Sequence, residues 1–109
     1  MENKIVLVVS IVNSGYSEKV MELGKTIGVR GGTIFNAAGS VAVDAEKLYG
    51  ISINPEKEVV LILVLKELAD KLLKAVYENL GSNSPAQGIA FTLPVDESST
   101  NIQNQYKKN

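Results

Sequence analysis

The chain contains no cysteine, no histidine and no tryptophan among its 109 residues. Without cysteine there is no disulfide framework and no thiol chemistry, and a reducing cytoplasm is compatible with that composition. Without histidine the commonest general base is missing, and so are the Ser-His-Asp and Cys-His arrangements and most zinc or copper sites. These absences argue against a conventional hydrolase. We expect no catalytic residue, no metal ligand and no resident cofactor.

Charge and hydropathy exclude two further classes of function. The chain has 11 basic and 12 acidic residues, so it lacks the basic footprint of a nucleic-acid-binding protein. The N-terminal apolar run Ile5–Val9 ends at Ser10 with no small-residue cleavage site after it, and it is far shorter than the about 20 apolar residues that span a bilayer. We therefore expect a cytoplasmic protein with no export signal and no membrane insertion.

The spacing of apolar residues predicts alternating strands and helices. Strands are expected at 4–12, 30–37, 58–65 and 88–95, and helices at 18–27, where Ser17 would cap the N-terminus, and at 66–80. The order β-α-β-β-α-β is that of the ferredoxin-like α+β fold, an antiparallel sheet with both helices on one face. Residues 1–97 would form this single domain, and residues 98–109 a polar tail.

The first and third predicted strands are apolar at nearly every position. A sheet with one face in water alternates apolar and polar residues, so this pattern predicts that both faces are buried. The chain is too short to encode a further layer. We therefore expect the open faces of several copies to pack together.

The longest connection joins the second and third strands and covers residues 39–55. A loop of that length inside a small domain is commonly functional. Gly31 and Gly32 precede the strand that leads into it, and glycine permits close approaches that other residues do not. The sequence thus predicts a rigid scaffold that carries one working loop.

Three blocks of sequence resemble the PII-like branch of the PII family of nitrogen regulatory, signal transduction proteins. They are GVRGGT (28–33), GISINPEKEVVLILV (50–64) and GIAFTLPVDE (88–97), of which the last is the most specific. Together with the helices, the resemblance covers residues 3–97. It implies a homotrimer of ferredoxin-like subunits that binds a regulatory adenine nucleotide (ATP, ADP, AMP or a cyclic adenylate) in clefts between neighbours.

The resemblance also implies how the ligand acts. The 39–55 segment matches the T-loop of the family, which changes conformation with the ligand and contacts a membrane transporter or a metabolic enzyme. Such a protein is an allosteric switch and not an enzyme. The exposed, adaptable residues expected to contact the partner are Asp44, Glu46, Lys47 and Tyr49.

Ligand-binding residues carry over only where the sequence matches the family. Thr33 and the two glycines before it match a segment that faces the adenine bound to a neighbouring subunit. Lys57 matches a lysine that reaches a phosphate, and Gly88 ends a loop whose backbone N–H groups would cradle an anion. The full candidate set is Arg30, Gly31, Gly32, Thr33, Gly39, Lys57, Gly88, Ile89 and Ala90.

Several family positions that face phosphate lack their charge in this chain. Ile89 stands where relatives have lysine, Thr100 and Ile102 stand at two arginine positions, and Ala38 at a third. Because charge-assisted hydrogen bonds are among the stronger contacts, the pattern favours a ligand less charged than ATP. Lys107 and Lys108 in the tail could supply positive charge only if the tail folds over the cleft.

Alternative interpretations of these residues remain open at this stage. Gly31 and Gly32 could form only a β-bulge or tight turn, and Lys57 could pair with Glu56 or Glu58. Arg30 could be a cleft anchor or part of a surface salt bridge. Asp44 and Glu46 are weak candidates for a metal site because they lack EF-hand spacing.

Two other functions compete with the ligand-sensing one. A trimer that has lost nucleotide binding would serve as a scaffold. A slow nucleotide hydrolase would need a carboxylate base such as Glu56 or Glu58, and nothing in the spacing singles one out.

Overall fold

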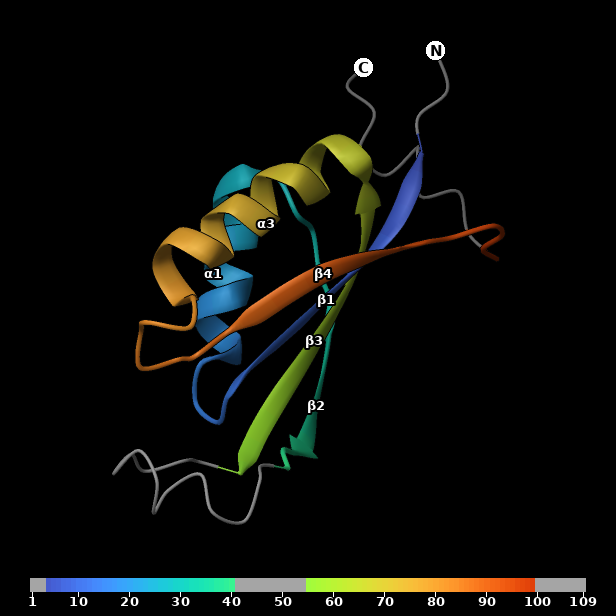
Figure 1. Ribbon diagram of the computed structural model, residues 1–109. Helices are drawn as coiled ribbons and strands as arrows, with labels where there is room; N and C mark the ends of the chain where they lie inside the picture. Colours follow the sequence, from blue (N-terminus) through green and yellow to red (C-terminus); the bar gives the residue numbers. More distant parts are fainter. Residues whose placement is uncertain (1–3, 41–54, 100–109) are drawn as a thin grey trace.

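The computed structural model describes residues 4–40 and 55–99. Within these residues the elements follow the predicted order β-α-β-β-α-β (Figure 1). They are β1 (Ile5–Asn13), α1 (Ser17–Ile27), β2 (Thr33–Ala38), β3 (Glu56–Leu65), α3 (Lys66–Leu80) and β4 (Ile89–Pro94). No helix in the described ranges is long and apolar enough to cross a membrane.

The four strands form one antiparallel sheet in the order β2-β3-β1-β4. The pairing of β1 with β3 runs in unbroken register along the whole of β1, from Ile5 opposite Leu65 to Asn13 opposite Lys57. Both helices lie on one face of the sheet (Figure 1). The ferredoxin-like α+β architecture expected from the sequence is therefore confirmed.

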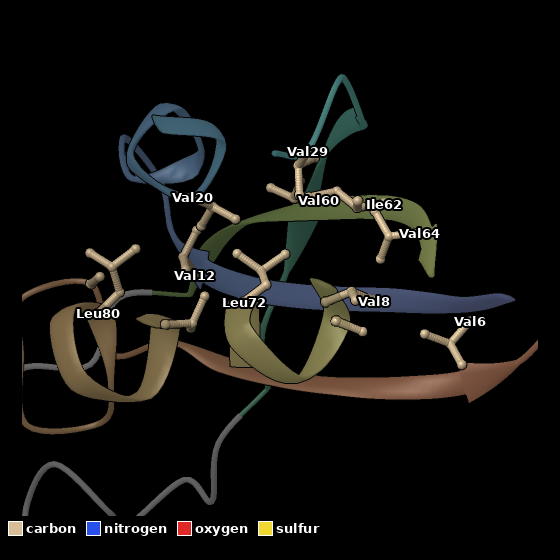
Figure 2. Close-up of a cluster of buried hydrophobic side chains, with 13 residues drawn as sticks. Val6, Val8, Val12, Val20, Val29, Val60, Ile62, Val64, Leu72 and Leu80 are labelled. Carbon is tan, nitrogen blue, oxygen red and sulfur yellow. The ribbon is translucent and has the colours of Figure 1, made fainter. Parts of the chain in front are cut away.

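The hydrophobic core lies between the helices and the sheet. Alternate residues of β1 and β3 point into it, because successive strand side chains face opposite sides, and side chains of both helices pack against them (Figure 2). The buried strand residues are Val6, Val8, Val12, Val60, Ile62 and Val64, and the buried helix residues are Val20, Ala69, Leu72, Val76 and Leu80.

The other face of the sheet is also apolar, as predicted, and no described element covers it (Figure 1). The strand register places Phe35, Val59, Ile11 and Ile89 side by side across all four strands, and Phe91 beside Val9 in the next row on the same face. Phe35 is 46% exposed and its partner Val59 is 8% exposed, while Phe91 is 40% exposed and its partner Val9 is 9% exposed. The residues of this open face are Leu7, Val9, Ile11, Phe35, Val59, Leu61, Leu63, Ile89, Phe91 and Leu93.

The N-terminus of α1 is capped differently from the prediction. Ser17 is the first residue of the helix, and no side chain at the preceding N-cap position forms the cap. Instead Glu58 Oε1 accepts hydrogen bonds from the backbone N–H of Gly15 at 2.8 Å and of Ser17 at 3.1 Å. The predicted Ser17 cap was wrong because a carboxylate from β3 satisfies these donors and carries the negative charge that a helix N-terminus favours.

Strand β2 begins at Thr33, three residues later than predicted. Arg30, Gly31 and Gly32 lie before it and are not part of the sheet. Glycine is a poor strand residue because it has no side chain to pack and loses more backbone entropy. The pair of glycines thus shortens the strand.

The cap on α1 generates a prediction about stability. The backbone N–H groups of Ser17 and Gly15 lower the pKa of Glu58. Its contribution to stability is therefore complete above the pKa of the unfolded chain and is lost as the pH falls through the lower pKa of the folded one. Glu58→Gln should reduce the free energy of unfolding at neutral pH by about 0.5–1 kcal/mol, the low end for a cap because Glu58 is only partly buried.

Urea denaturation of both proteins between neutral and acid pH measures this effect. The difference between wild type and Glu58→Gln should shrink as the pH falls. Glu22→Gln, an exposed change on α1, serves as the charge-matched control. A difference that stays constant at every pH would contradict the cap.

Candidate functional site

Several predicted ligand residues gather at one end of the sheet. Lys57 lies near the start of β3, beside the end of β1, and Gly39 directly follows β2. Gly88 immediately precedes β4, whose first residue, Ile89, pairs with Ile11 of β1. Antiparallel pairing thus brings residues that are distant in the sequence to the same end of the sheet (Figure 1).

The two ends of the 39–55 segment meet at this end of the sheet. The backbone N–H of Gly39 donates to the carbonyl oxygen of Pro55. A Cβ atom at Gly39 would lie 3.0 Å from Cε of Lys57 and 3.5 Å from its Cγ. The absence of a side chain at Gly39 therefore makes room for the stem of the lysine.

Lys57 has a neutral hydrogen-bond partner, the side-chain amide of Asn13. Its Nζ donates a hydrogen bond of 2.6 Å to Oδ1 of Asn13. Glu58, the alternative partner considered from the sequence, is engaged with the start of α1. The neutral Asn13 amide adds no negative charge beside the ammonium at this end of the sheet.

Asn13 was not singled out by the sequence, where it reads as part of the turn after the first strand. In the structure its side chain connects β1 to the 81–88 loop, because Nδ2 donates to the carbonyl oxygen of Pro85 at 2.9 Å and to Oε1 of Gln87 at 3.3 Å. Its backbone N–H donates to the carbonyl oxygen of Ala86 at 2.8 Å. The one available signal was a polar residue that ends an otherwise apolar strand.

The 81–88 loop does not offer a bare N–H at Gly88. That N–H donates to the carbonyl oxygen of Leu80 at 2.7 Å, and Gln87 N–H donates to the carbonyl oxygen of Ser84 at 3.0 Å. A Cβ atom at Gly88 would collide with the Leu80 carbonyl oxygen. Close packing against the end of α3 therefore accounts for this glycine, and the expected anion cradle is not formed by its N–H in this arrangement.

Ile89 and Ala90 line a small groove between α3 and β4. The groove has a volume of about 290 Å³, and the side chain of Tyr77, 81% exposed, stands at its rim. Its walls are mainly apolar. These positions therefore contribute shape and apolar surface to this region, and no positive charge.

The second group of candidates lies apart from Lys57. Thr33 pairs with Leu61 and Ala37 pairs with Lys57, so Thr33 is about 13 Å along the strand from the lysine, at about 3.3 Å per residue. Arg30, Gly31, Gly32 and Thr33 are all exposed. One subunit does not bring the two groups into contact.

The two glycines of this second group differ in their surroundings. A Cβ atom at Gly32 would lie 2.9 Å from Cγ1 of Ile62 and 3.0 Å from the carbonyl oxygen of Leu61, whereas one at Gly31 would meet nothing within 4 Å. Packing explains Gly32. It does not explain Gly31.

Other predicted positions lie outside the described residues. They include the partner-contact residues Asp44, Glu46, Lys47 and Tyr49, the departures at Thr100 and Ile102, and Lys107 and Lys108 of the tail. Among residues 4–40 and 55–99, no group of three or more His, Cys, Asp or Glu side chains could hold a metal ion.

The fold was compared with those of known proteins. No family model and no curated protein sequence matches the chain. Solved structures do match: GlnK of B. subtilis in complex with ATP superposes with a TM-score of 0.67 at 23% identity, over 87% of this chain and 84% of GlnK.

Two further structures show the same likeness. CPII, a nitrogen regulatory PII-like protein of Thiomonas intermedia K12 bound to ADP, AMP and bicarbonate, has a TM-score of 0.66 at 16% identity, over 88% of this chain and 94% of CPII. Arabidopsis thaliana PII bound to citrate has a TM-score of 0.62 at 21% identity, over 86% and 79%. The chain thus has the fold of the PII signalling proteins, as its sequence blocks indicated.

The contrast between the two glycines gives a prediction. Gly32→Ala should lower the free energy of unfolding by about 1–3 kcal/mol through overpacking, and Gly31→Ala should change it by less than about 0.5 kcal/mol. Thermal or urea unfolding measures both. If Gly31 faces a ligand, Gly31→Ala should weaken ligand binding without loss of stability. Equal destabilisation by both substitutions would contradict the packing described for these positions.

Proposed function

We propose that this protein is a PII-like regulatory protein, a homotrimer that binds an adenine nucleotide in clefts between its subunits. The proposal rests on the contacts among Gly39, Pro55 and Lys57 at one end of the sheet. A cationic side chain lies there beside both ends of the 39–55 segment. An anionic ligand bound at Lys57 would thus act directly on the base of the loop.

The open face of the sheet supports the assembly. Four exposed large side chains, Phe35, Ile89, Phe91 and Leu93, are between 40% and 58% exposed and lie on that face. Contiguous apolar surface of this kind marks an interface between proteins. The resemblance to the PII family implies that such an assembly also brings the Arg30–Thr33 segment of one subunit toward Lys57 of another, which a single subunit does not do.

The charge of the site supports the choice of ligand. GlnK was solved with ATP, CPII with ADP, AMP and bicarbonate, and Arabidopsis PII with citrate, and all of these ligands are anions. Among the described residues that gather at this end of the sheet, Lys57 is the one cation, and Ile89 adds none. We therefore expect AMP or a cyclic adenylate to bind more tightly than ATP.

The output of the switch would pass through the T-loop. In this proposal Asp44, Glu46, Lys47 and Tyr49 contact a partner protein such as a membrane transporter or a metabolic enzyme, and the ligand changes how that surface is presented. This assignment rests on the resemblance of the sequence and on the position of the loop base beside Lys57.

The hydrolase alternative loses one of its two candidate bases. Glu58 accepts two backbone hydrogen bonds, and its lowered pKa makes it a weaker base. A scaffold trimer without a ligand would share the same fold and open face. Ligand binding is therefore the property that separates the two remaining functions.

Calorimetric titration with AMP, cyclic AMP, ADP and ATP tests the ligand, with and without magnesium. Lys57→Ala should weaken binding of the tightest nucleotide by about 10- to 100-fold, as expected for loss of a charged hydrogen bond. Lys71→Ala, which removes an exposed lysine on α3, should bind like wild type. If the folded wild-type protein binds none of these nucleotides, ligand sensing by adenylates is rejected and the scaffold function is favoured.

A further inference from the structure

Asn13 has an unusually complete set of contacts for a residue at the end of a strand. It is 7% exposed, and its amide uses its oxygen and both N–H donors, toward Lys57, Pro85 and Gln87. Its backbone carbonyl oxygen also accepts a hydrogen bond of 3.2 Å from Tyr16 N–H. One side chain therefore joins β1, β3 and the 81–88 loop.

The contacts determine which way the amide points. Oδ1 faces an ammonium donor, and Nδ2 faces two acceptor oxygens. A flipped amide would oppose two donors on one side and acceptors on the other, leaving every group unsatisfied. Gln87, at a φ of 45°, holds a left-handed backbone that is uncommon outside glycine, and its side-chain oxygen is one of the two acceptors.

The chemistry of an amide suits this place better than that of a carboxylate. An aspartate would bind the ammonium as an ion pair and cancel its charge, and it would turn an oxygen toward the Pro85 carbonyl oxygen. The adjacent carboxylate of Glu58 lies opposite Val12 and is occupied by the start of α1. The Asn13 amide thus holds Lys57 in place without adding a negative charge.

We propose that Asn13 is a positioning residue of the ligand site: it holds the Lys57 ammonium against the 81–88 loop without neutralising it. This inference rests on the proposed function, because it assigns a role toward the same anionic ligand. If a ligand displaced Lys57, the hydrogen bonds from the same Asn13 amide to Pro85 and Gln87 would change as well.

Two substitutions separate positioning from charge. Asn13→Asp keeps an acceptor for Lys57 but adds a negative charge, and Asn13→Ala removes the acceptor without adding charge. Asn79→Asp is the matched control, because Asn79 is an exposed asparagine on α3 whose Nδ2 donates only to the Ala75 carbonyl oxygen among the contacts recorded for it.

The first readout needs no ligand. Lysines of the full-length protein are acylated with a neutral reagent, and the rate at Lys57 is measured by mass spectrometry relative to Lys71 in the same molecule. Relative to wild type, the rate should rise about threefold or more in Asn13→Ala and fall about threefold or more in Asn13→Asp, where an ion pair holds the amine. It should not change in Asn79→Asp.

The second readout is the affinity for AMP and ATP by calorimetry. Asn13→Asp should weaken binding by about tenfold or more, because the ligand must then compete with an internal carboxylate for the ammonium. Asn13→Ala should weaken it less, whichever variant has the lower melting temperature. A merely structural role predicts instead that affinity follows melting temperature.

The outcomes are distinguishable from those of the proposed function. Unchanged acylation of Lys57 in both Asn13 variants, or wild-type affinity in Asn13→Asp, overturns the role of Asn13. If wild type binds no nucleotide, the proposed function fails, and the acylation pattern alone then supports or overturns the hold of Asn13 on Lys57. If Asn13→Asp does not fold, faster acylation in Asn13→Ala supports the proposal, and an unchanged rate overturns it.

Discussion

The apolar open face of the sheet is the constraint on which the rest of the structure depends. Burial of apolar area is the main favourable term in folding and association, and here the helices use only one side of the sheet for it. The central valines Val9 and Val59 are already shielded by the phenylalanines beside them, while the outer residues remain exposed. None of the elements formed by residues 4–40 and 55–99 supplies a second layer on this face. The proposed trimer would supply that layer.

At this end of the sheet, two neighbouring residues of opposite charge have different hydrogen-bond partners. Lys57 and Glu58 are adjacent in the sequence, and strand alternation sends their side chains to opposite faces. Glu58 reaches the start of α1, where backbone N–H groups receive it. Lys57 reaches Asn13 instead. Because Glu58 is bound to the start of α1, the helix has its cap. The neutral Asn13 side chain holds Lys57 without adding a negative charge.

The sequence predicted the features that depend on local pattern. Helix Lys66–Leu80 has the bounds expected from its apolar stripe, and the apolar runs of β1 and β3 correctly indicated two apolar faces. It did not predict features that depend on residues distant in the sequence. The cap of α1 comes from Glu58, and local capping rules therefore pointed to Ser17. The role of Asn13 depends on β3 and on the 81–88 loop, neither of which is near it in the sequence.

Native mass spectrometry of the wild-type protein, with and without AMP or ATP, tests the central claim most directly. The account predicts a particle of three times the 11.7 kDa subunit mass that takes up nucleotide at up to one molecule per cleft. Dissociation of the trimer should release the nucleotide, because both subunits contribute to the site. A stable monomer at micromolar concentration, or a nucleotide bound to isolated subunits, would contradict the account.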